Sequence, residues 1–200
     1  MSEGTSIRCP NCGYPDTYQL PVEGRKCKSC KSVLIPKEYK EAESVHPVIR
    51  SKYISELSAL IAQKPDVADI PMALGLFYLA NKGYQFAIPQ FRKAIELDPM
   101  SSDAYFYLAV SLLEGKKPFL QQTATIKDIV EQLGLAESIE PKPIYFYFHA
   151  YVAFDFYSRK FIKTSPGHIE LKNQAISLGL SATDVNELFN MLKVSKPDNF

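Results

Sequence analysis

The chain has no tryptophan, few glycines and no excess of charge of either sign. Its 23 Lys and Arg against 22 Asp and Glu give a formal net charge of +1. No chain-wide field therefore favours nucleic acid or an anionic membrane. No run reaches the roughly 18 uncharged apolar residues that a membrane-spanning helix needs. The nearest run, residues 142–161, is interrupted by His149, Asp155 and Arg159.

The start of the chain also lacks an apolar run that could serve as a signal peptide, so we expect a cytoplasmic location and no membrane insertion. Motifs for catalysis are missing as well. We find no Gly-rich phosphate loop, no paired catalytic carboxylates, and no Ser–His–Asp or free-Cys arrangement. The SPGH sequence at 165–168 is typical of a turn and helix start. We expect no enzyme activity and no small-molecule substrate.

Cysteine is scarce and unevenly placed, which divides the chain. The four cysteines lie in residues 1–40, and the remainder holds none and has helical patterns almost throughout. Apolar residues make up 46% and charged residues 22%, as expected for a folded protein. We predict three parts: a four-cysteine module over 1–40, a linker and capping helix over 41–66, and a helical array over 67–200.

The cysteine module reads CPNCGYPDTYQLPVEGRKCKSC, two Cys-x-x-Cys pairs separated by fourteen residues. Each pair can wrap a tight turn that points two sulfurs at one ion, and two turns complete a tetrahedral thiolate set for zinc. Gly13, after the first pair, suits the left-handed backbone that such a turn often needs. Lys31 holds the corresponding place after the second pair, where slight strain is expected. The predicted ligands are Cys9, Cys12, Cys27 and Cys30.

Over about residues 7–36 this module resembles the zinc ribbon family, with residues 17–22 and 32–35 as its expected strands. The resemblance implies one structural Zn²⁺ in a closed site with no vacant position for chemistry. Two disulfides, rubredoxin-like iron and a redox dithiol are the alternatives. Disulfides fit poorly with a cytosolic chain. A redox pair would not need the second pair, and iron has no independent support.

Basic residues surround the predicted metal site: Arg8, Arg25, Lys26, Lys28 and Lys31. They could contact phosphates of a nucleic acid. Alternatively, they only offset the negative charge of the thiolates, which we favour.

The remainder begins with an amphipathic segment at 46–63, whose apolar face is Ile49, Tyr53, Leu57 and Leu60. Residues 68–101 then resemble the tetratricopeptide repeat (TPR), a 34-residue helix–turn–helix unit. The matching positions are Leu74, Gly75, Tyr78, Ala87, Phe91, Ala94 and Pro99. The small residues at 75 and 87 would let the two helices approach closely.

Degenerate units follow this repeat. Residues 102–115 repeat the first-helix pattern, and residues 128–141 repeat the second after an extra connection at 116–123. The aromatic run at 142–161 predicts a third first-helix that is buried on most sides. We expect His149 on it to be a satisfied core imidazole. Two more helices are expected at 167–180 and 181–194, the last with an N-cap signal from Ser181 and Asp184.

The TPR resemblance implies a concave face, lined by first helices, on which peptides bind. The groove positions carried over are Met72, Leu76, Leu79, Phe106, Val110, Leu113 and Phe146. They are apolar, so something must cover them. Either a hydrophobic segment of a partner protein does so, or the chain's own C-terminal helix folds back with Val185, Leu188, Phe189 and Leu192.

The predicted fold is mostly α, a TPR-like α-solenoid with a small N-terminal β-type zinc ribbon. The leading hypothesis for function is a non-catalytic adaptor or scaffold that binds a protein partner. The alternatives are nucleic-acid binding by Arg25, Lys26 and Lys28 of the ribbon, or a structural subunit of a larger complex.

Overall fold

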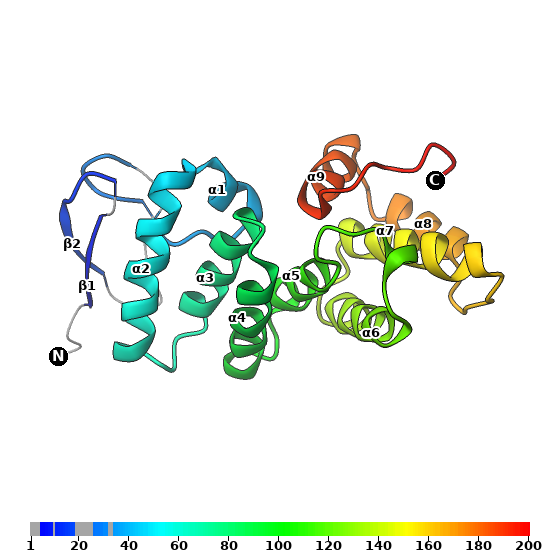
Figure 1. Ribbon diagram of the computed structural model, residues 1–200, viewed down its shortest axis with the longest axis horizontal. Coiled ribbons are helices and arrows are strands. Elements are labelled where there is room, and N and C mark those ends of the chain that lie inside the picture. Colours follow the sequence, from blue (N-terminus) through cyan, green and yellow to red (C-terminus); the bar gives the residue numbers. More distant parts are fainter. Residues whose placement is uncertain (1–4, 10, 19–25, 32–33) are drawn as a thin grey trace. The chain divides into compact units, whose positions relative to one another are not determined.

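The computed structural model describes residues 5–9, 11–18, 26–31 and 34–200 and is mostly helical (Figure 1). The chain forms two compact units, Met1–Pro99 and Met100–Phe200. The boundary between the two units follows the first TPR-like helix pair, at Pro99. The sequence patterns instead separate the cysteine module, the capping helix and the helical array. The boundaries at 40 and 66 stay predictions.

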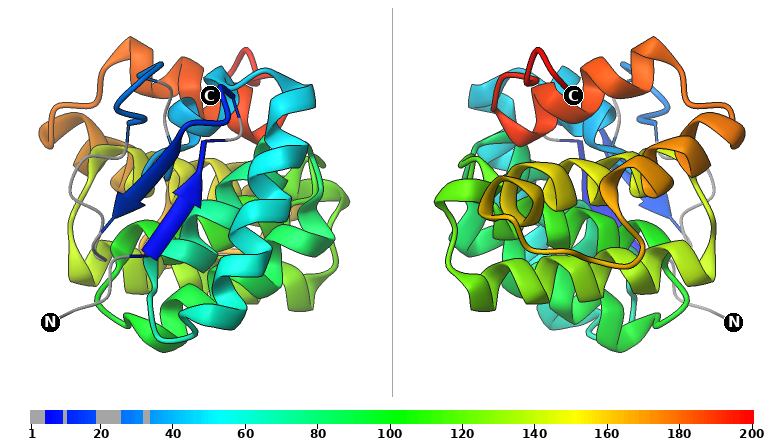
Figure 2. Two further views of the ribbon diagram at one scale, coloured as in Figure 1. Left: turned by 90° about the vertical axis from the view of Figure 1, so that its left-hand side faces the viewer. Right: turned by 90° about the vertical axis from the view of Figure 1, so that its right-hand side faces the viewer.

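The first unit opens with two short antiparallel strands, β1 (Thr5–Arg8) and β2 (Pro15–Tyr18), seen side by side in Figure 2. Thr5 lies opposite Tyr18, and Arg8 lies opposite Pro15. The predicted partner of β2 at 32–35 is wrong in its described part, because Leu34 and Ile35 form a buried bend. Residues 19–22 and 32–33 lie outside the described part of the chain.

Four helices complete this unit. Their bounds are α1 (Tyr39–Ser44), α2 (Pro47–Gln63), α3 (Asp69–Ala80) and α4 (Tyr84–Leu97). The predicted apolar face of α2 is confirmed at Tyr53, Leu57 and Leu60, which are buried. Both α1 and α2 pack against α3, and the Tyr53 ring stacks on Phe77 of α3 at 5.1 Å between centroids.

The close approach of α3 and α4 depends on Gly75, as the TPR resemblance implied. A Cβ atom built on Gly75 would lie 2.7 Å from the ring of Phe91, closer than real contacts allow. Leu74, Ala87 and Phe91 are buried around this crossing. The absence of one side chain therefore sets the distance between the two helices.

A charged residue that the periodicity did not single out joins three segments of this unit. Arg50 is only 7% exposed and donates to the backbone oxygens of Val45 (2.7 Å) and Ala80 (2.9 Å). It also donates to the Glu43 carbonyl and the Asn81 side chain. Since the carbonyls at a helix C-terminus have no partner in their own helix, Arg50 satisfies those that end α1 and α3.

The second unit holds five α-helices and the short helical segments that connect them. In order they are α5 (Ser102–Leu112), η1 (Pro118–Leu120), α6 (Thr123–Ile139), α7 (Pro143–Val152), η2 (Ala153–Tyr157), η3 (Ser158–Lys160), α8 (His168–Ser177) and α9 (Ala182–Leu192). Helix α5 packs against α6, and α7 packs against both α6 and α8. Figure 2 (right) shows α7 and α8 in yellow to orange.

The aromatic run forms the buried centre of this unit. Seven of the ten α7 residues are buried, including Tyr145, Phe148 and Tyr151, which confirms the predicted core role. The expected single helix changes character after Val152, because residues 153–157 form a π-helical turn. Asp155 in this turn is 2% exposed, accepts the Phe119 N–H at 2.9 Å and pairs with Arg159 at 2.8 Å.

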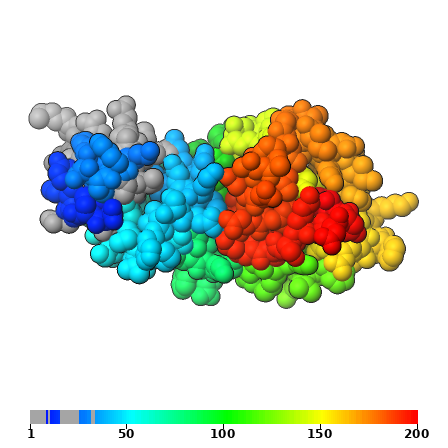
Figure 3. Space-filling model, turned by 90° about the horizontal axis from the view of Figure 1, so that it is seen from above, coloured from blue at the N-terminus to red at the C-terminus, as the bar shows by residue number. Residues whose placement is uncertain are grey.

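Helix α9 packs against α7 and α5, with Leu188, Phe189, Met191 and Leu192 buried. The N-cap prediction is confirmed, because the Ser181 hydroxyl accepts the Asp184 N–H at 3.1 Å. In Figure 3 the red C-terminal segment lies against the orange and yellow parts of the same unit. The fold-back of the C-terminal helix, one of the two expected covers, is therefore present. Among the described residues, no helix is both long and apolar enough to cross a membrane.

The Gly75 contact yields a prediction. Gly75→Ala should lower the free energy of unfolding by about 1–3 kcal/mol, because the added methyl group overpacks the α3–α4 crossing. Gly134→Ala on α6 is the matched control, since a Cβ there meets nothing within 4 Å. It should stabilise by about 0.4–1 kcal/mol. Urea unfolding followed by circular dichroism measures both, and wild-type stability of Gly75→Ala would contradict the close approach.

Candidate functional site

The four cysteines converge on one point of the first unit. Their four sulfur atoms all lie within 4.8 Å of one another, and they belong to Cys9, Cys12, Cys27 and Cys30. The Sγ atoms of Cys9 and Cys30 are 3.7 Å apart, as are those of Cys12 and Cys27. Sulfurs around a tetrahedral ion with Zn–S bonds near 2.3 Å would be separated by about 3.8 Å. The sulfur atoms are thus already spaced for a metal ion.

The same distances bear on one of the alternatives, the two disulfides. A disulfide needs its sulfurs about 2.05 Å apart, so the pairs at 3.7 Å are not disulfides in this arrangement. A four-sulfur set of this size can hold one metal ion, and its donor chemistry suits a soft or borderline ion. Four protein ligands would leave no open position on a tetrahedral ion.

Two matching turns build the cluster. The Gly13 N–H donates to the Cys9 carbonyl at 2.7 Å, and the Lys31 N–H donates to the Cys27 carbonyl at 2.9 Å. Gly13 has φ 73° and Lys31 has φ 61°, so both adopt the left-handed backbone predicted for them. Lys31 is the strained member, because a side chain disfavours this conformation.

The cysteines also influence each other's ionisation. The backbone N–H of Tyr14 lowers the pKa of Cys12, but desolvation and the neighbouring thiols outweigh it and raise that pKa to about 11. A metal ion must displace these protons to bind. Metal affinity should therefore increase with pH and weaken in acid.

The basic residues near the cluster are placed only in part. Lys26, Lys28 and Lys31 are exposed, and the Lys31 ammonium donates to the Lys28 carbonyl at 3.0 Å. Arg25 lies outside the described residues. The Asn11 amide donates to the Cys30 sulfur at 3.6 Å, a contact to the cluster that the spacing of the cysteines did not indicate.

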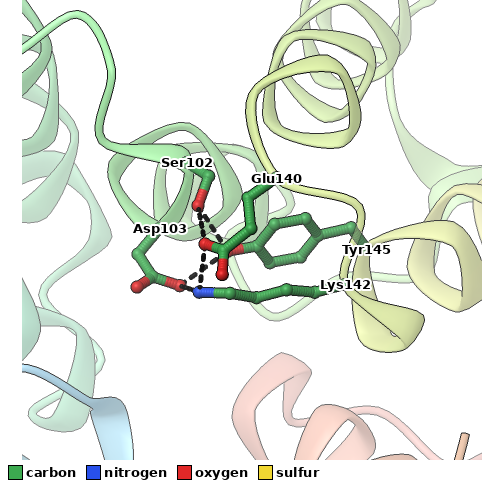
Figure 4. Close-up of polar contacts among 5 residues, drawn as sticks. All are labelled: Ser102, Asp103, Glu140, Lys142 and Tyr145. Carbon is green, nitrogen blue, oxygen red and sulfur yellow. Dashed lines mark hydrogen bonds and ion pairs between the residues drawn. The ribbon is translucent and has the colours of Figure 1, made fainter. Parts of the chain in front are cut away.

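The second unit contains a polar cluster of Ser102, Asp103, Glu140, Lys142 and Tyr145 (Figure 4). Tyr145 donates to Asp103 at 2.6 Å, and Lys142 pairs with Asp103 at 3.0 Å and Glu140 at 2.9 Å. Burial, followed by the Asp103 charge, raises the pKa of Tyr145. Its hydroxyl therefore stays protonated as a donor and is unsuited to act as a base. The cluster fastens the start of α5 to the start of α7.

His149 also has a structural partner, as predicted. Its Nδ1 lies 3.0 Å from the Glu137 carboxylate of α6, and both side chains are 12% exposed. This pair joins α6 to α7.

Most of the predicted groove positions are covered by the chain itself. Six are buried within their own units: Leu76, Leu79, Phe106, Val110, Leu113 and Phe146. Met72 is partly exposed. Helix α1 packs on α3, and α9 packs on α5 and α7. Helical segments of the chain itself thus already pack on the helices that carry the predicted groove positions. Binding of a partner at these positions stays a prediction.

The cysteine cluster yields a prediction. Purified chain should contain one metal ion per molecule, measured by elemental analysis. Cys27→Ser should lose it, because three thiolates no longer complete the tetrahedral set. Ser55→Ala, on the exposed side of α2, is the control and should keep the ion. A metal content that is unchanged in Cys27→Ser would contradict the assignment.

No family model matches the chain, and a search of curated proteins finds no significant match. Among solved structures, one titled MamA MSR-1 C2 is similar, with 19% identity, a TM-score of 0.48, and coverage of 70% of this chain and 76% of that one. One titled MamA RS-1 ArsTM double mutant has 14% identity, a TM-score of 0.47, and coverage of 77% and 76%. Both TM-scores lie below 0.5, so the description of the fold rests on the helix pairs of this chain.

Proposed function

We propose that the chain is a non-catalytic adaptor, stabilised by one structural Zn²⁺, that binds a protein partner through the first helices of its TPR-like pairs. The observation that carries the proposal is the packing of α9 on α5 and α7. A surface that accepts an amphipathic helix of its own chain has the shape and chemistry to accept one from a partner. The cytoplasmic location expected from the sequence belongs to the same proposal.

The cysteine head fits a structural role in this function. A ribbon-like module of about 40 residues has too few apolar side chains for a core of its own. Zinc would supply its stability, at roughly 10–16 kcal/mol of apparent binding free energy for sites of this type. The head would then present a second, rigid surface to the assembly.

The first test uses Met72, the partly exposed groove position on α3. A partner that co-purifies with wild-type chain should no longer co-purify with Met72→Glu, because a charge buried at an interface without a counter-ion is costly. Met100→Glu is the control, since Met100 is 70% exposed in the turn between α4 and α5. Circular dichroism checks that both variants fold. Retention of every partner by folded Met72→Glu would contradict groove binding.

Nucleic-acid binding is the second candidate, favoured by the exposure of Lys26 and Lys28 beside the cysteine cluster. Arg25 belongs to the same predicted contact. If the head binds phosphates, changing Lys26 and Lys28 together to Ala should weaken binding. The slope of log affinity against log salt concentration should become smaller by about two, one for each lost phosphate contact. Fluorescence anisotropy with labelled single- and double-stranded oligonucleotides measures this. No binding at low salt by wild-type chain would eliminate the candidate.

A further inference from the structure

One aromatic side chain of the second unit is almost wholly exposed, at a position where the backbone favours glycine. Phe161 follows η3 and is 96% exposed. Its N–H donates to the Ser158 carbonyl at 3.1 Å, and the next N–H, that of Ile162, donates to the Tyr157 carbonyl at 2.9 Å. These two bonds form a Schellman motif, in which the left-handed residue is usually Gly. Phe161 is that residue, with φ 57°.

This placement is unfavourable in two ways. A Cβ atom disfavours the left-handed backbone, and an exposed phenyl ring forgoes the free energy of burial. In the described part of the chain, the other non-Gly residues with positive φ are all charged: Lys31, Lys82, Glu114 and Lys193. Contacts within the chain offset little of this cost, since nearly all of the Phe161 side chain faces water. An outlier of this kind points to a contact outside the chain.

The neighbours of this ring are apolar or basic. Ile162 is 47% exposed, and Lys160 and Lys163 on either side are exposed as well. Residues 156–169 contain no Asp or Glu. Arg159 in the same segment pairs with a buried carboxylate, so the two lysines supply the net positive charge. The formal charge of +1 for the whole chain conceals this local excess.

A hollow of about 550 Å³ adjoins the ring. Phe161, Ile162 and Lys163 line it, together with Ser158 and His168 at the start of α8. The Ser158 hydroxyl lies 2.9 Å from the His168 Nδ1. The lining holds an ammonium group and hydroxyl groups but no carboxylate. It therefore suits a phosphate group bound next to an apolar contact.

Size and shape decide which partner this turn fits. An aromatic side chain buries about 150–250 Å², so two exposed apolar side chains cannot supply the roughly 800 Å² per partner of a stable protein interface. In Figure 3 the yellow-orange segment that contains the turn projects from the rest of the second unit. A lipid surface accepts a projecting apolar tip at the headgroup boundary and attracts the lysines beside it. Two such contributions together give reversible membrane binding.

We propose that the turn at residues 159–163 binds the surface of an anionic membrane. Phe161 and Ile162 enter the boundary between headgroups and acyl chains, and Lys160 and Lys163 lie among the lipid phosphates. This peripheral contact differs from a membrane-spanning helix, which the sequence does not predict. It goes beyond the adaptor function by placing the chain at a membrane, and it involves no residue of the predicted groove.

Co-sedimentation of the full chain with vesicles at low salt tests the proposal. The vesicles contain phosphatidylcholine, alone or with about 30% phosphatidylserine, an anionic lipid. Wild type should bind the phosphatidylserine vesicles at least about 10-fold more tightly, because each lysine near an anionic surface contributes about 5-fold. Lys163→Ala should lose about 5-fold of this binding.

Phe161→Gly separates a binding role of the ring from a structural one. It should bind the phosphatidylserine vesicles about 10-fold less tightly, because the ring no longer enters the bilayer. The midpoint of urea unfolding should nevertheless rise, because Gly adopts the left-handed backbone without strain. Met100→Ala is the control, since it removes another exposed apolar side chain outside this turn. It should bind as wild type does.

A second readout keeps an aromatic ring in place. The chain has no tryptophan, so Phe161→Trp introduces a single indole at the turn. With phosphatidylserine vesicles its fluorescence should shift to shorter wavelengths and be quenched by lipids with brominated acyl chains. Met100→Trp should keep the emission of a water-exposed indole.

Each contrary result has a defined meaning. Absence of wild-type binding to phosphatidylserine vesicles, or an unchanged emission of Phe161→Trp, would overturn the proposal. Equal binding by wild type and folded Phe161→Gly would overturn the role of the ring. Equal binding to both kinds of vesicle would overturn the assignment of an anionic surface. None of these outcomes bears on partner loss in Met72→Glu.

Discussion

The fold depends on covering helices that are apolar on nearly every side. In a helix pair, one side of the first helix meets its own partner and another meets the neighbouring pair. The remaining side would face water unless another segment covers it. The chain covers it locally, with α1 against α3 in the first unit and with α9 against α5 and α7 in the second. The four buried apolar residues of α9 alone are worth on the order of 6–12 kcal/mol as an upper estimate. A short array is therefore stable without a long stack of repeats.

This burial creates a second requirement. Polar groups at helix ends and some charged side chains are buried with the apolar faces, and each needs a hydrogen-bond or ion-pair partner. Arg50 meets the carbonyls that end α1 and α3. Asp155 accepts a backbone N–H and holds Arg159, while Glu137 engages His149. Each is a polar group whose burial is offset by specific partners. The Tyr151 hydroxyl is the exception among the described residues.

The features that the sequence predicted correctly are local ones. The spacing of two Cys-x-x-Cys pairs is enough to predict that four sulfurs come together. Gly75 predicts a close helix crossing, because a Cβ atom there would collide with Phe91. Ser181 and Asp184 together predict the start of a helix. The errors concern pairing across distance. Residues 5–8 hold one apolar side chain in four, which is too weak a pattern to indicate β1 or its partner. Nothing in the periodicity distinguishes Arg50 as buried, since an amphipathic face tolerates a long side chain at its edge.

The insertion of Phe200 shows the same limit. A single aromatic residue after a Pro-containing tail carries no periodic signal, so its destination could not be predicted. The prediction that the C-terminal helix folds back was correct for α9, yet α9 ends at Leu192, and the tail after it places the Phe200 ring against Tyr147. Helix and tail differ in the area they bury and in the number of contacts they would lose on release. Four buried apolar side chains hold α9, whereas one inserted ring holds the tail.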